Sequence, residues 1–170
     1  AASDVYKRQE LAAYLQSLGL KPGDRVAIMM PNLLQYVIAM YACLRAGYIV
    51  VNINPLYTSR EVNGTLRDSE AKAIIIIENF AKTLQNALPG TKCEHIITTA
   101  VGDLFPFFKR TLVNFVVRKV KKMVPEYSLP NAVGFNEALE IGRRHGFTAH
   151  EIHNTDIAFL QYTGGTTGVA

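Results

Sequence analysis

Four short runs of apolar residues constrain the fold of this chain more than any other feature of its sequence. They are RVAIMM (25–30), YIVVNI (48–53), AIIII (73–77) and HIITT (95–99). Each run is nearly continuous instead of alternating with polar residues, which is typical of a β-strand covered on both faces. Strands of this kind belong to parallel sheets, because the crossover connections place helices on both sides. A fifth strand is expected at DIAFLQY (156–162).

Amphipathic segments of helical period separate these runs. Helices are expected at residues 10–18, 33–47, 59–68, 80–88 and 135–144. Thr58 and Glu61 have the spacing of a capping box, Asn32 is a suitable N-cap, and Gly47 is suited to end a helix. The alternation of strand and helix predicts an α/β fold with a mostly parallel sheet and flanking helices.

The sequence TGGTTG (163–168) directly follows Tyr162, the last residue of the fifth predicted strand. Glycine lets backbone N–H groups approach a phosphate closely, and threonine hydroxyls add further hydrogen-bond donors. Open α/β sheets bind phosphate in glycine-rich loops at the carboxyl ends of strands. The two commonest phosphate fingerprints do not fit. The motif G-x-x-x-x-G-K-[ST] fails because Val169 stands five residues after Gly164, where it requires glycine, and G-x-G-x-x-G fails because Gly165 directly follows Gly164. From the residues alone, a phosphate loop and a flexible terminus stay open as alternatives.

Residues 103–127 interrupt the alternation with a basic amphipathic segment. Its helical period predicts one polar side, shared by Arg110, Asn114, Arg118, Lys121 and Lys122. Six cationic residues lie in this segment, more than the net charge of +4 of the whole chain. They are Lys109, Arg110, Arg118, Lys119, Lys121 and Lys122. Two interpretations stay open. The helix packs on its own domain, or it lies on the anionic inner face of a membrane and contacts it through Arg110, Arg118, Lys121 and Lys122. Because the basicity is confined to one segment, no nucleic-acid partner is expected.

Other features of the sequence exclude several classes of protein. The 49% hydrophobic content of 170 residues supports one globular unit. No apolar run reaches the roughly 18 residues that a transmembrane helix needs. Cys43 and Cys93 lie among apolar residues, so two buried thiols in a cytoplasmic protein are expected instead of a disulfide or a metal site. HEIH (150–153) lacks the H-E-x-x-H spacing, and no metal site is expected there.

The stretch YTGGTTGVA (162–170) resembles the signature loop of the adenylate-forming enzymes, the acyl-CoA synthetase superfamily. Three upstream stretches resemble the bacterial long-chain fatty acid CoA ligases in particular: GDRVAIMMPNLLQY, RAGYIVVNINPLYTSRE and FVVRKVKKMVPEYSLP. The similarity extends over residues 10–170. It implies that the chain is part of the large N-terminal AMP-binding domain of such an enzyme.

The resemblance implies a two-step reaction that uses ATP, Mg²⁺ and coenzyme A. The carboxylate of a long-chain fatty acid attacks the α-phosphate of ATP, and coenzyme A thiolate then displaces AMP to form a thioester. The family's loop implies ATP-phosphate contacts at Tyr162, Thr163, Gly164, Gly165, Thr166, Thr167 and Gly168. These donors stabilise charge on the departing pyrophosphate. No catalytic residue beyond this loop and no protein ligand for a metal is expected in the chain.

Departures from the family pattern lead to further expectations. The chain stops before the loop's Lys-Gly, and the family's C-terminal domain is expected to be absent. Residues 1–9 do not resemble the family and are expected to be foreign or disordered, with residues 10–170 forming a partial N-terminal AMP-binding domain. A polypeptide of these residues alone is expected to be inactive. The alternative is a noncatalytic membrane or protein interaction module built on the basic helix.

Overall fold

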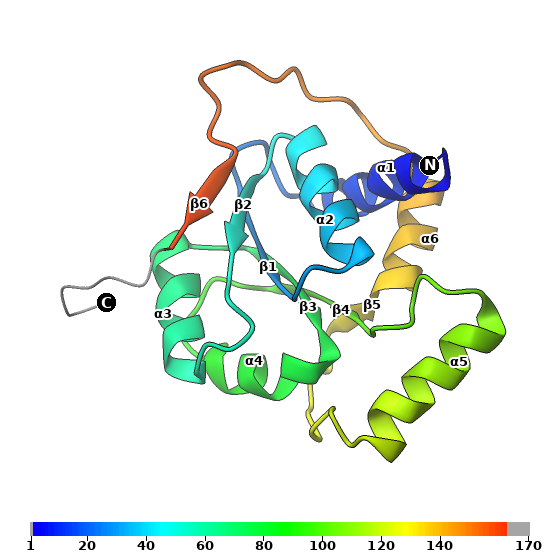
Figure 1. Cartoon of the computed structure of the whole chain (residues 1–170). Helices are drawn as coiled ribbons and strands as arrows, with labels where there is room; N and C mark the ends of the chain where they lie inside the picture. The colour runs from blue at the N-terminus through cyan, green and yellow to red at the C-terminus, as the bar shows by residue number, and fades with distance from the viewer. Residues whose placement is uncertain (1, 163–170) are drawn as a thin grey trace.

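A computed structural model of the protein describes residues 2–162, with side chains from Val5 onward. Within these residues six strands form one sheet in the order β5-β4-β3-β1-β2-β6, and every neighbouring pair is parallel (Figure 1). The strands are β1 (Arg25–Met29), β2 (Ile49–Asn52), β3 (Ala73–Ile77), β4 (His95–Thr99), β5 (Ala132–Gly134) and β6 (Phe159–Gln161). The predicted α/β class with a mostly parallel sheet is confirmed.

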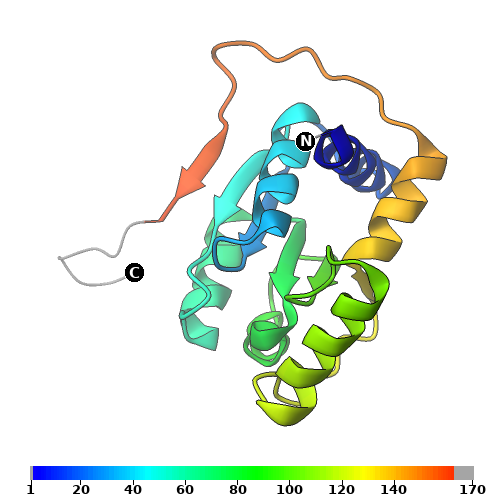
Figure 2. The ribbon, with the colours of Figure 1, turned by 45° about the vertical axis from the view of Figure 1, so that its right-hand side comes forward.

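Helices cover both faces of the sheet. The α-helices are α1 (Ala2–Ser17), α2 (Leu34–Arg45), α3 (Ser59–Ser69), α4 (Ala81–Ala87), α5 (Phe107–Phe115) and α6 (Phe135–His145). A 3₁₀ turn, η1 (Glu78–Phe80), precedes α4, and a π-helical turn, η2 (Val116–Val120), continues α5. Helices α1, α2 and α6 pack on one face and α3 and α4 on the other, while α5 lies at the periphery (Figures 1 and 2).

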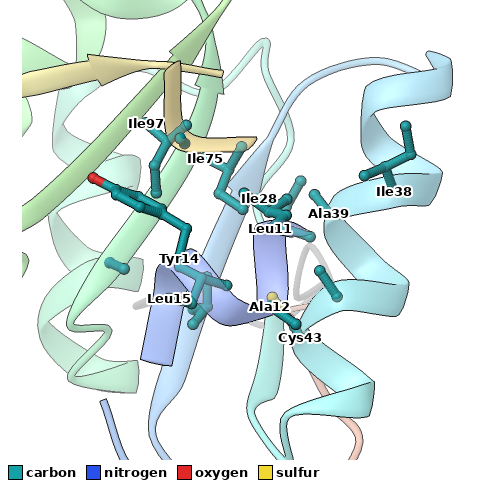
Figure 3. Close-up of a cluster of buried hydrophobic side chains, with 14 of the residues drawn as sticks. Leu11, Ala12, Tyr14, Leu15, Ile28, Ile38, Ala39, Cys43, Ile75 and Ile97 are labelled. Carbon is teal, nitrogen blue, oxygen red and sulfur yellow. The ribbon is translucent and has the colours of Figure 1, made fainter. Parts of the chain in front are cut away.

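The central strands supply side chains to both layers of the core. Ile28 of β1 and Ile75 of β3 pack with Leu11 and Ile38 on the side of α1 and α2 (Figure 3). Their neighbours along the strands, such as Ile74, point to the opposite side, toward α3 and α4. All five residues of β3 are buried. This double coverage is what the continuous apolar runs predicted.

Local signals in the sequence set several helix ends as predicted. The backbone N–H of Thr58 donates to Glu61 Oε2 at 2.7 Å, and the N–H of Glu61 donates to Thr58 Oγ1 at 3.4 Å. This capping box begins α3 at Ser59. Gly47 follows α2 with a φ of 75°, a left-handed conformation that glycine adopts without strain.

Other predicted boundaries were wrong. Helix α1 begins at Ala2 instead of Glu10, so residues 2–9 are helical and not disordered. This first part of α1 lies along α2, where the Arg8 guanidinium stacks 4.5 Å from the ring centre of Tyr41. The N-cap of α2 is Leu33 instead of Asn32, and its side chain makes no capping bond. Strand β5 was missed because three residues form no recognisable apolar run.

A long connection carries the chain from α6 to β6 at the opposite edge of the sheet (Figure 2). The amide of Gln16 fixes it to α1, since Gln16 Nε2 donates to the Thr148 carbonyl at 2.7 Å and Thr148 N–H donates to Gln16 Oε1 at 3.1 Å. The His150 ring lies against Gly47, where a Cβ would come within 2.3 Å of it. These contacts guide the chain to a position where β6 pairs with β2.

Helices α1 and α6 approach so closely that only glycine fits between them. A Cβ on Gly142 of α6 would lie 1.8 Å from the Glu10 carbonyl oxygen and 2.8 Å from the Tyr14 nitrogen, both backbone atoms of α1. No rotamer change relieves a clash with backbone. The close approach also places Arg143 beside Glu10, whose Oε1 accepts from Arg143 Nε at 2.7 Å.

We predict that Gly142→Ala lowers the free energy of unfolding by about 3 kcal/mol, because the two helices must separate to admit the methyl group. Gly64→Ala is a matched control in the interior of α3, where a Cβ meets no atom within 4 Å. It should raise the free energy of unfolding by about 1 kcal/mol through helix propensity. Urea denaturation measures both, and equal stability of Gly142→Ala and the original chain would contradict the prediction.

Candidate functional site

The carboxyl ends of β1, β2 and β6 meet at one edge of the sheet, as their parallel pairing requires. A cavity of about 400 Å³ opens there. Its polar lining consists of Asn32, Tyr36, Asn52, Asn54, Tyr57, Gln161 and Tyr162. Because amide and phenol groups are uncharged near neutral pH, the cavity offers hydrogen bonds to a ligand more than it offers charge.

A chain of hydrogen bonds crosses this cavity and reaches the end of β6. Tyr36 Oη donates to Asn52 Oδ1 at 3.0 Å, and Asn52 Nδ2 donates to Gln161 Oε1 at 3.1 Å. The three residues belong to α2, β2 and β6. They therefore fix the last residue of the edge strand relative to the centre of the sheet.

Tyr162, the next residue, is anchored on the other side of the sheet. Its ring packs against the core beneath α3, and its hydroxyl donates to Asp68 Oδ2 at 2.5 Å. Burial, together with the Asp68 carboxylate, raises the pKa of Tyr162 to about 12. Side-chain hydrogen bonds thus hold the chain at both Gln161 and Tyr162 as it leaves β6.

The topology suggests another place to look for a site, the point where the order of the strands reverses. The chain passes from β1 to β2 in one direction along the sheet and from β3 to β4 in the opposite direction. The topological switch point, where this direction reverses, therefore lies between β1 and β3. Glu78 follows β3 there and is 3% exposed. Arg118 donates to it from Nε at 2.9 Å and from a terminal nitrogen at 2.6 Å. This ion pair lies beside a cavity of about 220 Å³ that is lined by residues at the ends of β3, β4 and β5 and by none from β1.

A larger hollow of about 500 Å³ lies beside Tyr162, next to the amino end of β1. Its charged groups pair with one another, since Arg25 lies 3.1 Å from Glu70 and Lys92 also pairs with Glu70. The remaining charged lining residue, Asp68, accepts the hydrogen bond of Tyr162, so each charged side chain of the lining is engaged within the protein. We therefore place the candidate site at the carboxyl edge, beside Gln161.

The predicted amphipathic helix is present as α5 and η2, but the orientation of its faces differs from expectation. Asn114, on the predicted polar side, faces the domain, where its Oδ1 accepts from the Gly102 N–H at 2.8 Å. Arg118, also on that side, binds Glu78. The valines at 113, 116 and 117 are half-buried, whereas Phe108, Leu112 and Phe115 point to solvent. The apolar residues of the segment are thus divided between two sides.

The four residues predicted to contact a membrane lie in different surroundings. Lys121 and Lys122 are exposed at the end of η2. Arg118 is held by Glu78, and half-buried Arg110 stacks its guanidinium 5.6 Å from the ring centre of Phe107. Within residues 2–162 no helix is long and apolar enough to span a membrane.

Comparison with known proteins decides the family. The family model described as AMP-binding enzyme matches residues 4–170, almost the whole chain. The chain belongs to the AMP-binding enzyme family. The resemblance noted in the loop and in the upstream stretches is thereby confirmed.

The relatives include several ligases. The chain is 56% identical over 165 residues to the long-chain-fatty-acid–CoA ligase of Haemophilus influenzae, covering 96% of this chain and 29% of that protein. It is 39% identical to the ligase of that name from Bacillus subtilis, covering 94% of this chain and 28% of the relative. A crystal structure of a long-chain-fatty-acid–CoA ligase from Archaeoglobus fulgidus matches 98% of this chain and 28% of its own, with a TM-score of 0.72 and 25% identity. The chain therefore spans less than a third of the length of these relatives.

Of the predicted phosphate contacts, only Tyr162 lies within the described residues. Thr163, Gly164, Gly165, Thr166, Thr167 and Gly168 lie outside them. The described structure therefore gives the position of the strand that leads into the loop and the side chains that anchor its last residues. The phosphate contacts of all seven residues stay predictions.

Sequence reasoning missed the residues that support this site. Asn52, Gln161 and Asp68 bind through side chains from three separate elements, and no short spacing marks them. Glu78 carried a usable signal, because an acidic residue directly after the apolar run AIIII has no favourable place in a core without a cation. Its partner, Arg118, lies 40 residues further along the chain.

We predict that Asp68→Asn lowers the pKa of Tyr162 from about 12 toward its ordinary value, because the variant loses the negative charge that disfavours the phenolate. Burial of the Tyr162 ring keeps its pKa partly raised in the variant. The ¹³Cζ resonance of labelled Tyr162, assigned with Tyr162→Phe, measures the titration. Asp156→Asn removes an exposed carboxylate six residues before Tyr162 that has no part in raising its pKa, so this variant should leave the pKa of Tyr162 unchanged. If Tyr162 titrates at the same pH in the original chain, in Asp68→Asn and in Asp156→Asn, the assigned role of Asp68 is contradicted.

Proposed function

We propose that this chain is the N-terminal part of an ATP-dependent long-chain fatty acid CoA ligase. The observation that carries the proposal is the 56% identity to a long-chain-fatty-acid–CoA ligase over nearly the whole chain. In the reaction, a carboxylate oxygen of the fatty acid bonds to the α-phosphorus of ATP, and pyrophosphate leaves. The sulfur of coenzyme A then bonds to the acyl carbon, and AMP leaves with the electrons of the broken bond.

The residues from Tyr162 to Gly168 bind the ATP phosphates in this proposal. Threonine hydroxyls and backbone N–H groups are donors without charge, which fit the oxygens of a polyphosphate. When bound, Mg²⁺ neutralises part of the phosphate charge. The described part of the chain contributes rigidity, because bonds from Asn52 and Asp68 fix the residues that enter the loop. Preorganised donors stabilise developing charge without the cost of reorienting water.

The proposal places the protein in the cytoplasm, where ATP and coenzyme A are available. Both cysteines are free thiols in the structure, as expected in a reducing compartment. Burial raises the pKa of Cys43 and of half-buried Cys93 to about 12, so neither thiol is suited to act as a nucleophile.

A second candidate function is peripheral contact with an anionic membrane. The observation that favours it is the set of large apolar side chains that α5 exposes to solvent. The two functions are compatible, because long acyl chains partition into membranes. A noncatalytic interaction module built on α5 is the alternative if the chain has no part in ligation.

We expect the polypeptide of 170 residues to form no acyl-CoA when it is tested alone, because it spans 29% of the length of a ligase relative. Mass spectrometry of a mixture with ATP, Mg²⁺, palmitate and coenzyme A measures the product. Detection of palmitoyl-CoA above a control without the polypeptide would contradict this expectation.

The ligase proposal is tested by a chimera. Residues 4–170 of this chain replace the matching residues of the Haemophilus influenzae ligase, and the chimera is expected to form palmitoyl-CoA. Replacing Thr166 and Thr167 by valine removes two hydroxyl donors at nearly constant volume and should lower kcat by roughly 100-fold. Thr111→Val is the control, because this exposed hydroxyl bonds only to the Phe107 carbonyl of its own helix in the described structure. A folded but inactive chimera, or an unchanged kcat in the double variant, would overturn the proposal.

A further inference from the structure

We infer that one side of α5 and η2 is a built membrane-docking face for anionic lipid, with an aromatic ridge between lysines. The surface called here the docking face consists of Phe108, Leu112, Phe115 and Lys119 on one side of the helix, together with the exposed Lys121, Lys122 and Met123 that follow the helix end. The inference rests on the proposed membrane contact and deepens it. It specifies which side inserts and which side holds the helix on the protein.

The helix is held on the domain by its polar contacts. Asn114 accepts from Gly102 N–H and donates to Asp103 Oδ1 at 3.1 Å. One turn further, Arg118 binds Glu78, whose side chain is 4% exposed. Breaking the Arg118 contact leaves a buried carboxylate without a cation, which is unfavourable. These bonds fix the rotation of the helix about its axis, so the opposite side must face outward.

The side that faces outward is unusually apolar. The exposed fractions are 86% for Phe108, 63% for Leu112 and 56% for Phe115. In an α-helix Phe108, Leu112 and Phe115 follow one another at i, i+4 and i+7, so they form one ridge. Single exposed apolar residues are common on protein surfaces, whereas a contiguous set of large ones marks a binding surface.

The charges around the ridge identify an anionic partner. From Leu104 to Pro125 the sequence contains no Asp or Glu. Arg118 is neutralised by Glu78, but Lys119, Lys121 and Lys122 are exposed and make no salt bridge within the described residues. Lys119 lies almost in line with Phe108 and Phe115, and its long side chain can extend past them toward a headgroup. Apolar residues bordered by lysines match the boundary between acyl chains and anionic headgroups.

The position of the docking face also fits a lipid surface. Helix α5 follows the carboxyl end of β4, so it lies at the same edge of the sheet as the candidate phosphate site (Figure 1). It projects from the periphery of the domain instead of lying over the sheet (Figure 2). Docking through this face brings the edge that bears the candidate site near the membrane, where long acyl chains are concentrated. Lys121 and Lys122 keep their predicted role, whereas Arg118 becomes a residue that orients the helix.

The absence of tryptophan from the sequence permits a direct test. Phe108→Trp places one reporter on the ridge, and Leu56→Trp places a control on another exposed apolar side chain outside the docking face. With vesicles of phosphatidylcholine and phosphatidylglycerol, Trp emission at position 108 should shift to shorter wavelength and be quenched by brominated lipid. Emission at position 56 should stay unchanged.

Partition of the chain into the same vesicles tests the contributions of the apolar ridge and of the lysines separately. Replacing Phe108 and Phe115 by serine should reduce partition tenfold or more, by about the effect of removing two inserted rings. Replacing Lys121 and Lys122 by glutamine should reduce it roughly 30-fold on anionic vesicles and little on pure phosphatidylcholine. The exposed Lys82→Gln is the matched charge control and should leave partition unchanged.

The outcomes separate the docking face from membrane contact in general. If the original chain does not bind anionic vesicles, both are overturned. If it binds but the Phe108 and Phe115 variant binds equally well and the reporter at position 108 does not respond, membrane contact stands and the docking face is wrong. If the reporter is already buried without lipid, either in a self-associated chain or in the Haemophilus chimera, protein covers the ridge and the inference is overturned. None of these outcomes bears on the ligase proposal, which the chimera's activity tests.

Discussion

The burial of β1 and β3 on both faces is the constraint on which the rest of the structure depends. A strand covered on both sides can satisfy its backbone N–H and C=O groups only through its neighbours in the sheet. In this chain those neighbours are parallel, and each connection between consecutive central strands crosses over one face with a helix. The helices α1, α2 and α6 on one side, and α3 and α4 on the other, follow from this requirement.

Parallel pairing also decides where polar chemistry is located. All carboxyl ends lie at one edge, so Asn52 and Gln161, which are far apart in the chain, become hydrogen-bonded neighbours. The edge strand β6 has few ladder bonds of its own, and the side chains of Gln161 and Tyr162 supplement them. The strand that leads into the proposed phosphate loop is therefore anchored from the cavity side and from the core side.

A competition between apolar burial and charge pairing determines the orientation of α5. Burying the ridge of Phe108, Leu112 and Phe115 on the domain is favourable for those rings, but it rotates Arg118 away from Glu78. A buried carboxylate that loses its cation costs several kcal/mol, so the pair of Glu78 and Arg118 opposes this rotation. The half-buried valines of α5 and η2 lie on the same side of the helix as Arg118 and pack on the domain. Their burial offsets part of the apolar burial that the exposed ridge lacks.

The sequence by itself determined the class of fold, five of the six described strands, the capping box at Thr58 and the family, because these depend on local period and short motifs. It did not determine β5, the start of α1, or the bonds that join Asn52 to Gln161 and Asp68 to Tyr162, since their partners come from distant segments. The helical period of residues 103–127 predicted an amphipathic helix but not which side faces the protein. Only the tertiary structure decided that, because the answer depends on a carboxylate 40 residues earlier in the chain, at the end of a buried strand.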